Sequence, residues 1–395
     1  GKIHVEDAHG APSLTVSAPR AWSRSGRAVN ARLRVEGDSI VLDVDADGEA
    51  VLVDPSWVLT GSLNSTRTHF FSGNGAATLN DGRVFIVGGW YDGIGGGGRE
   101  GEVFNPSTDT WSSVGSPSEY RYGLGTAKLA DGRVLVSGGC SDIYGCATDQ
   151  VEIFNPSTNA FTPASPIPES PEYFHTATLL SNGRVLLVGG YYQGDASRVY
   201  DPGSDSWTVA HDPRPSRVIH TATRLLDGRV LVVGGDDGST SWDFFDAAGN
   251  YTGTASGFPN GHGFSAHTAT LLSDGRVLLV GGWYDPGAAV VFDPSSGTWS
   301  DVSPNPSVGL YTYGHTATKL ADGRVLIAGG AYNPTLTFVF NPATNTFSTG
   351  PAMIASHYYH VAATLTDGRA LVAGGYDTYP ETIVDSEGRV HLRTR

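Results

Sequence analysis

The sequence predicts an all-β protein, a seven-bladed β-propeller with a short N-terminal β appendage. Glycine and proline account for 53 and 22 of the 395 residues, and charged residues for only 16 %. This composition suits many short strands joined by tight turns. The second observation is a recurring pair of glycines with successive spacings of 50, 51, 45, 47, 48 and 45 residues, a period typical of propellers and other repeat folds. The pairs are Gly88-Gly89, Gly138-Gly139, Gly189-Gly190, Gly234-Gly235, Gly281-Gly282, Gly329-Gly330 and Gly374-Gly375.

Each repeat contains four predicted strands. A first apolar strand leads into an Asp/Asn-Gly-Arg turn, and a second ends at the paired glycines, as in ATLLSDGRVLLVGG. After a variable loop, two further strands flank an Asn/Asp-Pro turn, as in VVFDPSSGTWSDV. One such sheet cannot bury both of its faces alone, whereas seven sheets packed radially can.

These motifs resemble the kelch repeat over residues 68–395. The resemblance rests on the paired glycines, on the aromatic residue before Asn/Asp-Pro, and on an aromatic residue in the last strand. The last-strand aromatics are Trp111, Phe161, Trp207, Trp299 and Phe347. Because kelch propellers include enzymes, lectins and protein-binding modules, the resemblance implies the fold and leaves the function open.

Within this group, the repeat is most similar to the central propeller of galactose oxidase-type proteins. That family holds copper with a Tyr-His pair before a first strand, and Tyr359-His360 matches the pair. Trp90 is in a position to imitate the family's stacking tryptophan. However, Gly73 stands where the family has its cross-linked tyrosine, and neither cysteine is placed to form the thioether. The resemblance therefore implies that the complete radical copper site is absent.

We predict two domains, an N-terminal β appendage at residues 1–67 and the propeller at residues 68–395. Residues 1–67 alternate like β-strands but fit the repeat poorly, and the segment VLVDPSWVLTGSL loosely resembles the second half of a blade. The appendage is therefore a candidate to donate a strand that closes the ring. Nothing near Gly1 has the pattern of a signal peptide, so we expect that any such peptide has been removed or never existed.

The charge balance restricts the partners. The formal net charge is −15, with 25 basic against 40 acidic residues, and both nucleic acid and anionic membranes need a basic footprint. We therefore expect neither nucleic-acid binding nor membrane insertion, and we expect a small-molecule or carbohydrate ligand, with a protein partner left open. Cys140 and Cys146 are predicted to form a loop-closing disulfide, which indicates an extracellular or periplasmic location.

Histidine recurs eight residues before the turn glycine in repeats three to seven. These residues are His175, His220, His267, His315 and His360. Imidazole is a common metal ligand and titrates near neutral pH, so copper or zinc binding, or acid–base catalysis by Tyr359, His360 and His175, is one interpretation. The favoured alternative is a scaffold role, since a residue repeated in one register more often bonds to a neighbouring blade. The arginines of the seven Asp/Asn-Gly-Arg turns, at the opposite rim, are expected to be structural.

The loops around the histidines are rich in aromatic residues. Such side chains can stack on a sugar ring and bind its hydroxyl groups, or can pack within the propeller. The residues predicted to contact a ligand, together with His220, His267 and His315, are Trp90, Tyr91, Tyr122, Tyr173, Tyr192, Trp283, Tyr284, Tyr313, Tyr332 and Tyr376.

Outside the repeat, Asp43, Asp45 and Asp47 alternate before Gly48. Alternating carboxylates followed by glycine are typical of the start of a calcium loop, while a plain β-hairpin turn is the alternative. Three functions stay open: a secreted or surface propeller that binds carbohydrate or another polyhydroxylated ligand, a saccharide-active oxidase or lyase that uses the same rim, and a protein-interaction scaffold.

Overall fold

The chain divides into two compact units, residues 1–59 with 379–395, and residues 60–378. The sequence predicted a boundary after residue 67 and a propeller that extends to residue 395. A computed structural model describes residues 2–6, 12–17, 21–23, 28–36, 39–45, 51–53, 60, 63–64, 75–91, 96–97, 100–141, 147–169, 171–191, 196–211, 217–235, 240–258, 261–302, 312–332, 334–375, 382–384 and 390–392.

The first unit contains only β-strands in its described residues. Its sheets have the orders β1-β2, β5-β4-β3-β6 and β35-β36, and the β4–β5 pair aligns Leu33 with Leu42. The strands are β1 (Lys2–Glu6), β2 (Pro12–Ser17), β3 (Ala21–Ser23), β4 (Ala28–Glu36), β5 (Ser39–Asp45), β6 (Val51–Val53), β35 (Thr382–Val384) and β36 (Val390–Leu392).

The second unit is a β-propeller whose repeats each begin with two strands joined by an Asp/Asn-Gly-Arg turn. The first strands are β7 (Ala76–Thr78), β13 (Gly125–Lys128), β17 (Thr176–Leu179), β21 (Thr221–Arg224), β25 (Thr268–Leu271), β29 (Thr316–Lys319) and β33 (Val361–Thr364). The second strands are β8 (Val84–Val87), β14 (Val134–Ser137), β18 (Val185–Val188), β22 (Val230–Val233), β26 (Val277–Val280), β30 (Val325–Ala328) and β34 (Ala370–Ala373).

Six repeats add two outer strands to this pair. The third strands are β11 (Gly101–Asn105), β15 (Val151–Asn155), β19 (Ala196–Asp201), β23 (Ser241–Phe245), β27 (Ala289–Asp293) and β31 (Thr337–Asn341). The fourth strands are β12 (Thr110–Val114), β16 (Ala160–Ala164), β20 (Ser206–His211), β24 (Tyr251–Ser256), β28 (Thr298–Asp301) and β32 (Thr346–Thr349). A short pair, β9 (Trp90–Tyr91) and β10 (Gly96–Gly97), lies in the first repeat.

The prediction of seven four-stranded blades is wrong for the part of the chain that is described. Six blades are four-stranded, and the seventh repeat contributes the two-stranded sheet β33-β34. The repeat motif predicts its own first two strands well because the turn between them is local, whereas outer strands depend on longer connections. No described residue forms a helix long and apolar enough to cross a membrane.

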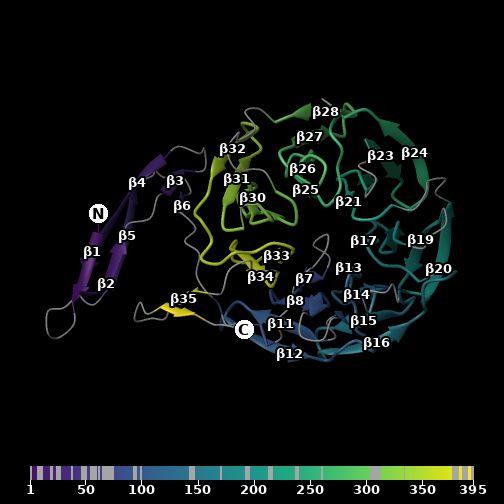
Figure 1. Ribbon diagram of the computed structural model, residues 1–395, viewed down its shortest axis with the longest axis horizontal. Coiled ribbons are helices and arrows are strands. Elements are labelled where there is room, and N and C mark those ends of the chain that lie inside the picture. The colour runs from purple at the N-terminus through teal and green to yellow at the C-terminus, as the bar shows by residue number, and fades with distance from the viewer. Residues whose placement is uncertain are drawn as a thin grey trace. The chain divides into compact units, whose positions relative to one another are not determined.

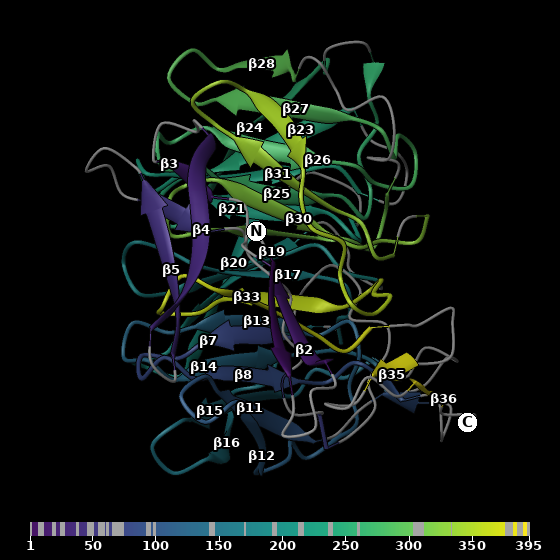
Figure 2. The same cartoon turned by 90° about the vertical axis from the view of Figure 1, so that its left-hand side faces the viewer.

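The first strands of all seven repeats surround a central channel (Figure 1). Each first strand contacts that of the next repeat, and β33 contacts β7, so the ring of first strands is closed. The strands β33, β7 and β13 lie side by side in both views (Figure 1 and Figure 2).

Burial follows position within a blade. In the six four-stranded blades every residue of the second strand is buried, because neighbouring blades cover both faces of the sheet. The fourth strands are largely exposed. The last-strand aromatics pack on the aromatic residue of the third strand, as Trp299 does on Phe292 with ring centroids 4.7 Å apart. The kelch-like Trp is thus a packing residue.

Four of the Asp/Asn-Gly-Arg turns, those of Arg83, Arg229, Arg276 and Arg369, bond to the neighbouring blade, as expected for a structural role. The Arg276 backbone N–H and Nε donate to the Asp274 carboxylate, and Nη2 donates to the Pro342 carbonyl oxygen of the next blade at 2.6 Å. Arg369 of the last repeat reaches the Pro106 carbonyl oxygen of the first blade at 3.2 Å, which joins the ring at its closure.

Candidate functional site

The channel holds a cavity of about 260 Å³. Its walls are threonine and alanine side chains of β17, β21, β25, β29 and β33, together with His220, His267, His315, His360 and Tyr359. Among the described residues that line it, none is Asp, Glu, Lys or Arg. The cavity is therefore uncharged and offers mainly hydroxyl groups.

The five repeated histidines join each blade to the one before it. In each case Nε2 lies within hydrogen-bond distance of a hydroxyl oxygen at the first or last position of a strand in the preceding blade. The pairs are His175–Ser137 at 2.9 Å, His220–Thr176 at 3.0 Å, His267–Thr221 at 2.8 Å, His315–Thr268 at 2.9 Å and His360–Thr316 at 2.8 Å. This geometry favours the scaffold interpretation.

The paired glycines explain why histidine recurs with them. A Cβ on Gly234 would lie 2.1 Å from the Phe264 carbonyl oxygen and 2.9 Å from Cε1 of His267. The next residue, Gly235, donates its N–H to the same carbonyl oxygen at 2.9 Å. The first glycine therefore leaves room for the imidazole, and the second bonds to the loop that carries it.

Burial keeps these imidazoles neutral. It lowers the pKa of His175 and of His267 to about 3 and that of His315 to about 4, and it lowers the pKa of His220 and His360 well below the ordinary value. A group that stays unprotonated across the physiological range is not a proton donor there. The burial of these histidines and the hydrogen bonds of their Nε2 atoms thus indicate a structural role.

The residue before each histidine carries its side chain at one mouth of the channel. Four of these residues have positive φ although they are not glycine: Phe174 (61°), Ile219 (56°), Ala266 (52°) and Tyr359 (51°). In the repeat of His315 the position is Gly314, where a Cβ would lie 2.9 Å from Cδ1 of Tyr359. The tight turn is similar in these blades, so the side chain of the residue before each histidine decides which group lies at the mouth of the channel.

On one side, the mouth is filled by what we call the packed cluster, Trp90, Tyr122, Tyr173, Phe174 and Tyr191. Trp90 meets Tyr122 edge to face with centroids 5.1 Å apart, and Tyr173 stacks on Tyr191 at 4.9 Å. Tyr122 and Phe174 are buried in an apolar core with Ile219. Ring packing thus accounts for several aromatic residues predicted to contact a ligand.

On the other side lies the aromatic patch, which we define as Trp283, Tyr313, Tyr332 and Tyr359. Tyr313 contacts all three others, with centroid distances of 6.2 Å to Trp283, 5.5 Å to Tyr332 and 6.0 Å to Tyr359. Trp283 Nε1 donates to Tyr359 Oη at 3.1 Å. Trp283 is 39 % exposed and Tyr332 is 59 % exposed, as is Tyr284 at 57 %. The patch combines exposed aromatic rings with a hydrogen bond that holds the Trp283 ring.

Tyr359 and His360 do not form an acid–base pair. Burial raises the pKa of Tyr359 above its ordinary value, so the phenol keeps its proton at neutral pH. His360 is 1 % exposed, and its Nε2 bonds to the Thr316 hydroxyl. Nε2 of His360 is thus engaged with a hydroxyl group, and no group of three His, Cys, Asp or Glu among the described residues could hold a metal.

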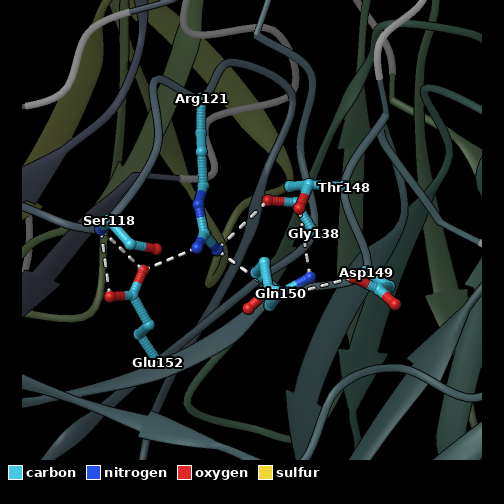
Figure 3. Close-up of polar contacts among 7 residues, drawn as sticks. All are labelled: Ser118, Arg121, Gly138, Thr148, Asp149, Gln150 and Glu152. Carbon is cyan, nitrogen blue, oxygen red and sulfur yellow. Dashed lines mark hydrogen bonds and ion pairs between the residues drawn. The ribbon is translucent and has the colours of Figure 1, made fainter.

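Three buried ion pairs were not predicted from the sequence. In the second blade, Arg121 Nη2 lies 2.5 Å from Glu152, and Nη1 donates to the Gln150 carbonyl oxygen at 3.0 Å (Figure 3). The third blade has the reverse order, with Glu172 in the loop and Arg198 on β19. The fourth returns to Arg217 with Asp243. In the second to fourth repeats, one charged residue stands three positions before the histidine position and an opposite charge stands on the third strand. This pairing is the signal that could have revealed them.

Several predicted residues cannot be placed in this site. Tyr192 and Tyr376 lie outside the described residues, and so does the side chain of Tyr91. Cys140 is buried, but Cys146 also falls outside the description, so the disulfide stays a prediction.

Asp43 and Asp45 lie on β5, and Asp47 is not described. A hairpin turn at Asp47 would pair β5 with β6. Instead β5 pairs with β4 and β6 pairs with β3, so β5 and β6 are not adjacent strands, contrary to the hairpin alternative. Calcium binding stays a prediction, to be checked by the effect of a chelator on thermal stability.

The closed ring of short sheets, with a channel bounded by first strands, defines a β-propeller. Residues 73–118 and 129–168 match the Kelch motif model, so the kelch motif is present in the first two repeats. A solved structure of a fungal alcohol oxidase of the AA5 family, in complex with copper, shares the fold with a TM-score of 0.67 at 17 % identity, over 81 % of this chain and 72 % of that chain. The chain thus resembles the propeller of galactose oxidase-type proteins. No curated protein matches the sequence.

Proposed function

We propose that this propeller binds a carbohydrate or another small polyhydroxylated ligand at the aromatic patch. The observation that carries the proposal is the half-exposed ring of Trp283, held by its bond to Tyr359 beside an uncharged, hydroxyl-lined cavity. A fixed aromatic face stacks on the C–H groups of a sugar without ordering a flexible side chain first. Threonine hydroxyls can exchange hydrogen bonds with the sugar's hydroxyl groups.

The test is glycan-array screening followed by calorimetric titration of wild type and of Trp283→Ala. Removing the stacking face should weaken binding by about 1–3 kcal/mol, a loss of about fivefold to 150-fold. Leu226→Ala is the matched control, since Leu226 is 70 % exposed beside the Asp-Gly-Arg turn of the fourth repeat. Unchanged binding by Trp283→Ala would reject the patch as the site.

An oxidase or lyase function takes second place, because the pKa of Tyr359 is raised and His360 is bonded to Thr316. Elemental analysis of the purified protein checks this order: stoichiometric copper or zinc would favour the enzyme. A protein partner at the same patch is the remaining alternative.

We also propose that the two-stranded sheet β33-β34 serves as the seventh blade, because its first strand closes the ring of first strands, and that the protein works outside the cytoplasm. The second proposal rests on Cys140 and Cys146. Under denaturing, non-reducing conditions the protein should contain no thiol that reacts with maleimide, and two reactive thiols would contradict it.

A further inference from the structure

The sequence of the loops around the aromatic patch contains no lysine or arginine. Between residues 230 and 375 the sequence has only four Lys or Arg residues: Arg276, Lys319, Arg324 and Arg369. The arginines stand in Asp-Gly-Arg turns, and Nε of each donates to the aspartate of the same turn. Lys319 is the last residue of β29, at the end that leads into such a turn. All four therefore lie at the rim opposite the patch.

Distance and salt separate these charges from the patch. A strand of four residues spans roughly 13 Å at about 3.3 Å per residue, and the screening length at physiological ionic strength is about 8 Å. Each arginine is also paired with a carboxylate, which cancels much of its field. An anion at the patch would consequently meet little attraction from them.

Two carboxylates belong to the same blade as Trp283. Asp285 follows Trp283 by two residues and has 36 % of its side chain exposed, and Asp301 has 37 % exposed. His262 lies between them, with Nδ1 bonded to Asp285 and Nε2 3.4 Å from Asp301 Oδ1. This imidazole fixes the direction of the Asp285 carboxylate.

We infer that the patch selects saccharides by charge. It accepts sugars that are uncharged or carry an amino group, and it rejects those that carry sulfate or carboxylate groups. The inference rests on the proposed function, because it concerns the ligand of the same patch. An anionic ligand would lose its hydration and meet Asp285, and the one basic side chain beside that carboxylate, His262, is already shared between Asp285 and Asp301. An ammonium group would gain the carboxylate as a partner and an open aromatic face.

The experiment uses one sugar backbone in three charge states: an N-acetylglucosamine oligomer, its de-acetylated glucosamine counterpart and its 6-O-sulfated counterpart, all of one length. A glycan array of neutral, amino-bearing, uronate and sulfated sugars runs in parallel. We expect binding in the order amine, neutral, sulfated, with about twofold to fivefold between successive members. Salt should weaken the amine and leave the neutral oligomer unchanged.

Two variants with the same change in net charge locate the effect. Asp285→Asn should reduce the preference for the amine about twofold to fivefold, since the amide keeps the bond to His262 but loses the charge. Asp109→Asn should leave the preference unchanged, because Asp109 lies in the turn at the opposite rim, where Asn159 and Asn345 occupy the same position in other blades with the same positive φ.

The outcomes separate this inference from the proposed function. Sulfated or uronate sugars that bind as well as the neutral ones, and lose binding in Trp283→Ala, would overturn the charge selection while supporting the patch. Binding that survives Trp283→Ala would overturn the proposed function. An array without any bound sugar would overturn both.

Discussion

Lowering the pH from 7.5 to 5.5 should destabilise the propeller strongly. Five buried histidines have folded-state pKa values near 3–4 or well below the ordinary value, while in the unfolded chain each titrates near pH 6.5. A base whose folded pKa is depressed stabilises the fold fully above its unfolded pKa, and this stability is lost as the pH falls through that value. In this window only the unfolded state takes up the protons.

The size of this loss of stability follows from the fraction of protonated histidine in the unfolded chain at each pH. At pH 5.5, relative to pH 7.5, protonation lowers the free energy of an unfolded histidine by about 1.4 kcal/mol, or about 7 kcal/mol for all five. Glu172 acts in the opposite sense, because burial raises its pKa to about 8 and protonation in the folded state would return about 2–3 kcal/mol. The net loss is about 4 kcal/mol, a large share of a typical stability of about 5–15 kcal/mol.

Urea unfolding of the full chain at several pH values, followed by near-UV circular dichroism, measures this loss. His267→Gln should retain a hydrogen bond to Thr221 and remove one titrating group, so the net loss of stability between pH 7.5 and 5.5 should be about one third smaller. Aspartates with lowered pKa, such as Asp227, contribute only below about pH 5 and do not obscure the window. Equal free energies of unfolding at pH 7.5 and 5.5 would refute the reasoning.

Two further predictions concern packing between and within blades. Gly234→Ala should destabilise the protein by more than about 2 kcal/mol, since its Cβ would lie 2.1 Å from the Phe264 carbonyl oxygen. Gly297→Ala has a nearly equal φ, 69° against 72°, and no atom near its Cβ, so thermal unfolding of the pair separates the contact from backbone strain. Exchanging the charges of Arg217 and Asp243, as Arg217→Glu with Asp243→Arg, should restore most of the about 3–5 kcal/mol lost on breaking the pair, because the third blade has this reversed order; a double variant no more stable than Arg217→Ala would contradict it.

The sequence anticipated the features that repeat. The spacing of the glycine pairs located every first and second strand, and the Asp-Gly-Arg motif located the turns between them. Both are local signals, since the turn conformation depends on residues within a few positions of each other. The outer half of the seventh repeat lacked such a motif, and its described residues add no third and fourth strand to the β33-β34 sheet.

The aromatic residues show where sequence reasoning reached its limit. Trp90 and Trp283 both follow a glycine pair and received the same prediction. In the structure, Trp90 packs edge to face on the buried Tyr122, whereas Trp283 is 39 % exposed. The residues that the next two blades place beside each ring are alike, Gly123 and Phe174 on one side and Gly314 and Tyr359 on the other, so the difference in exposure follows from the packing of the assembled ring, which no local pattern reports.

The sequence alone determined that this protein is a ring of kelch repeats, because strand periodicity and turn chemistry are written within each repeat. Only the tertiary structure decided what the repeated histidines do. Each bonds to a hydroxyl group 38 to 47 residues away in the chain, on a neighbouring blade that reaches it only once the ring is formed. The same closure buries the imidazoles and thereby fixes them as neutral structural groups, and it leaves the aromatic patch exposed beside the channel.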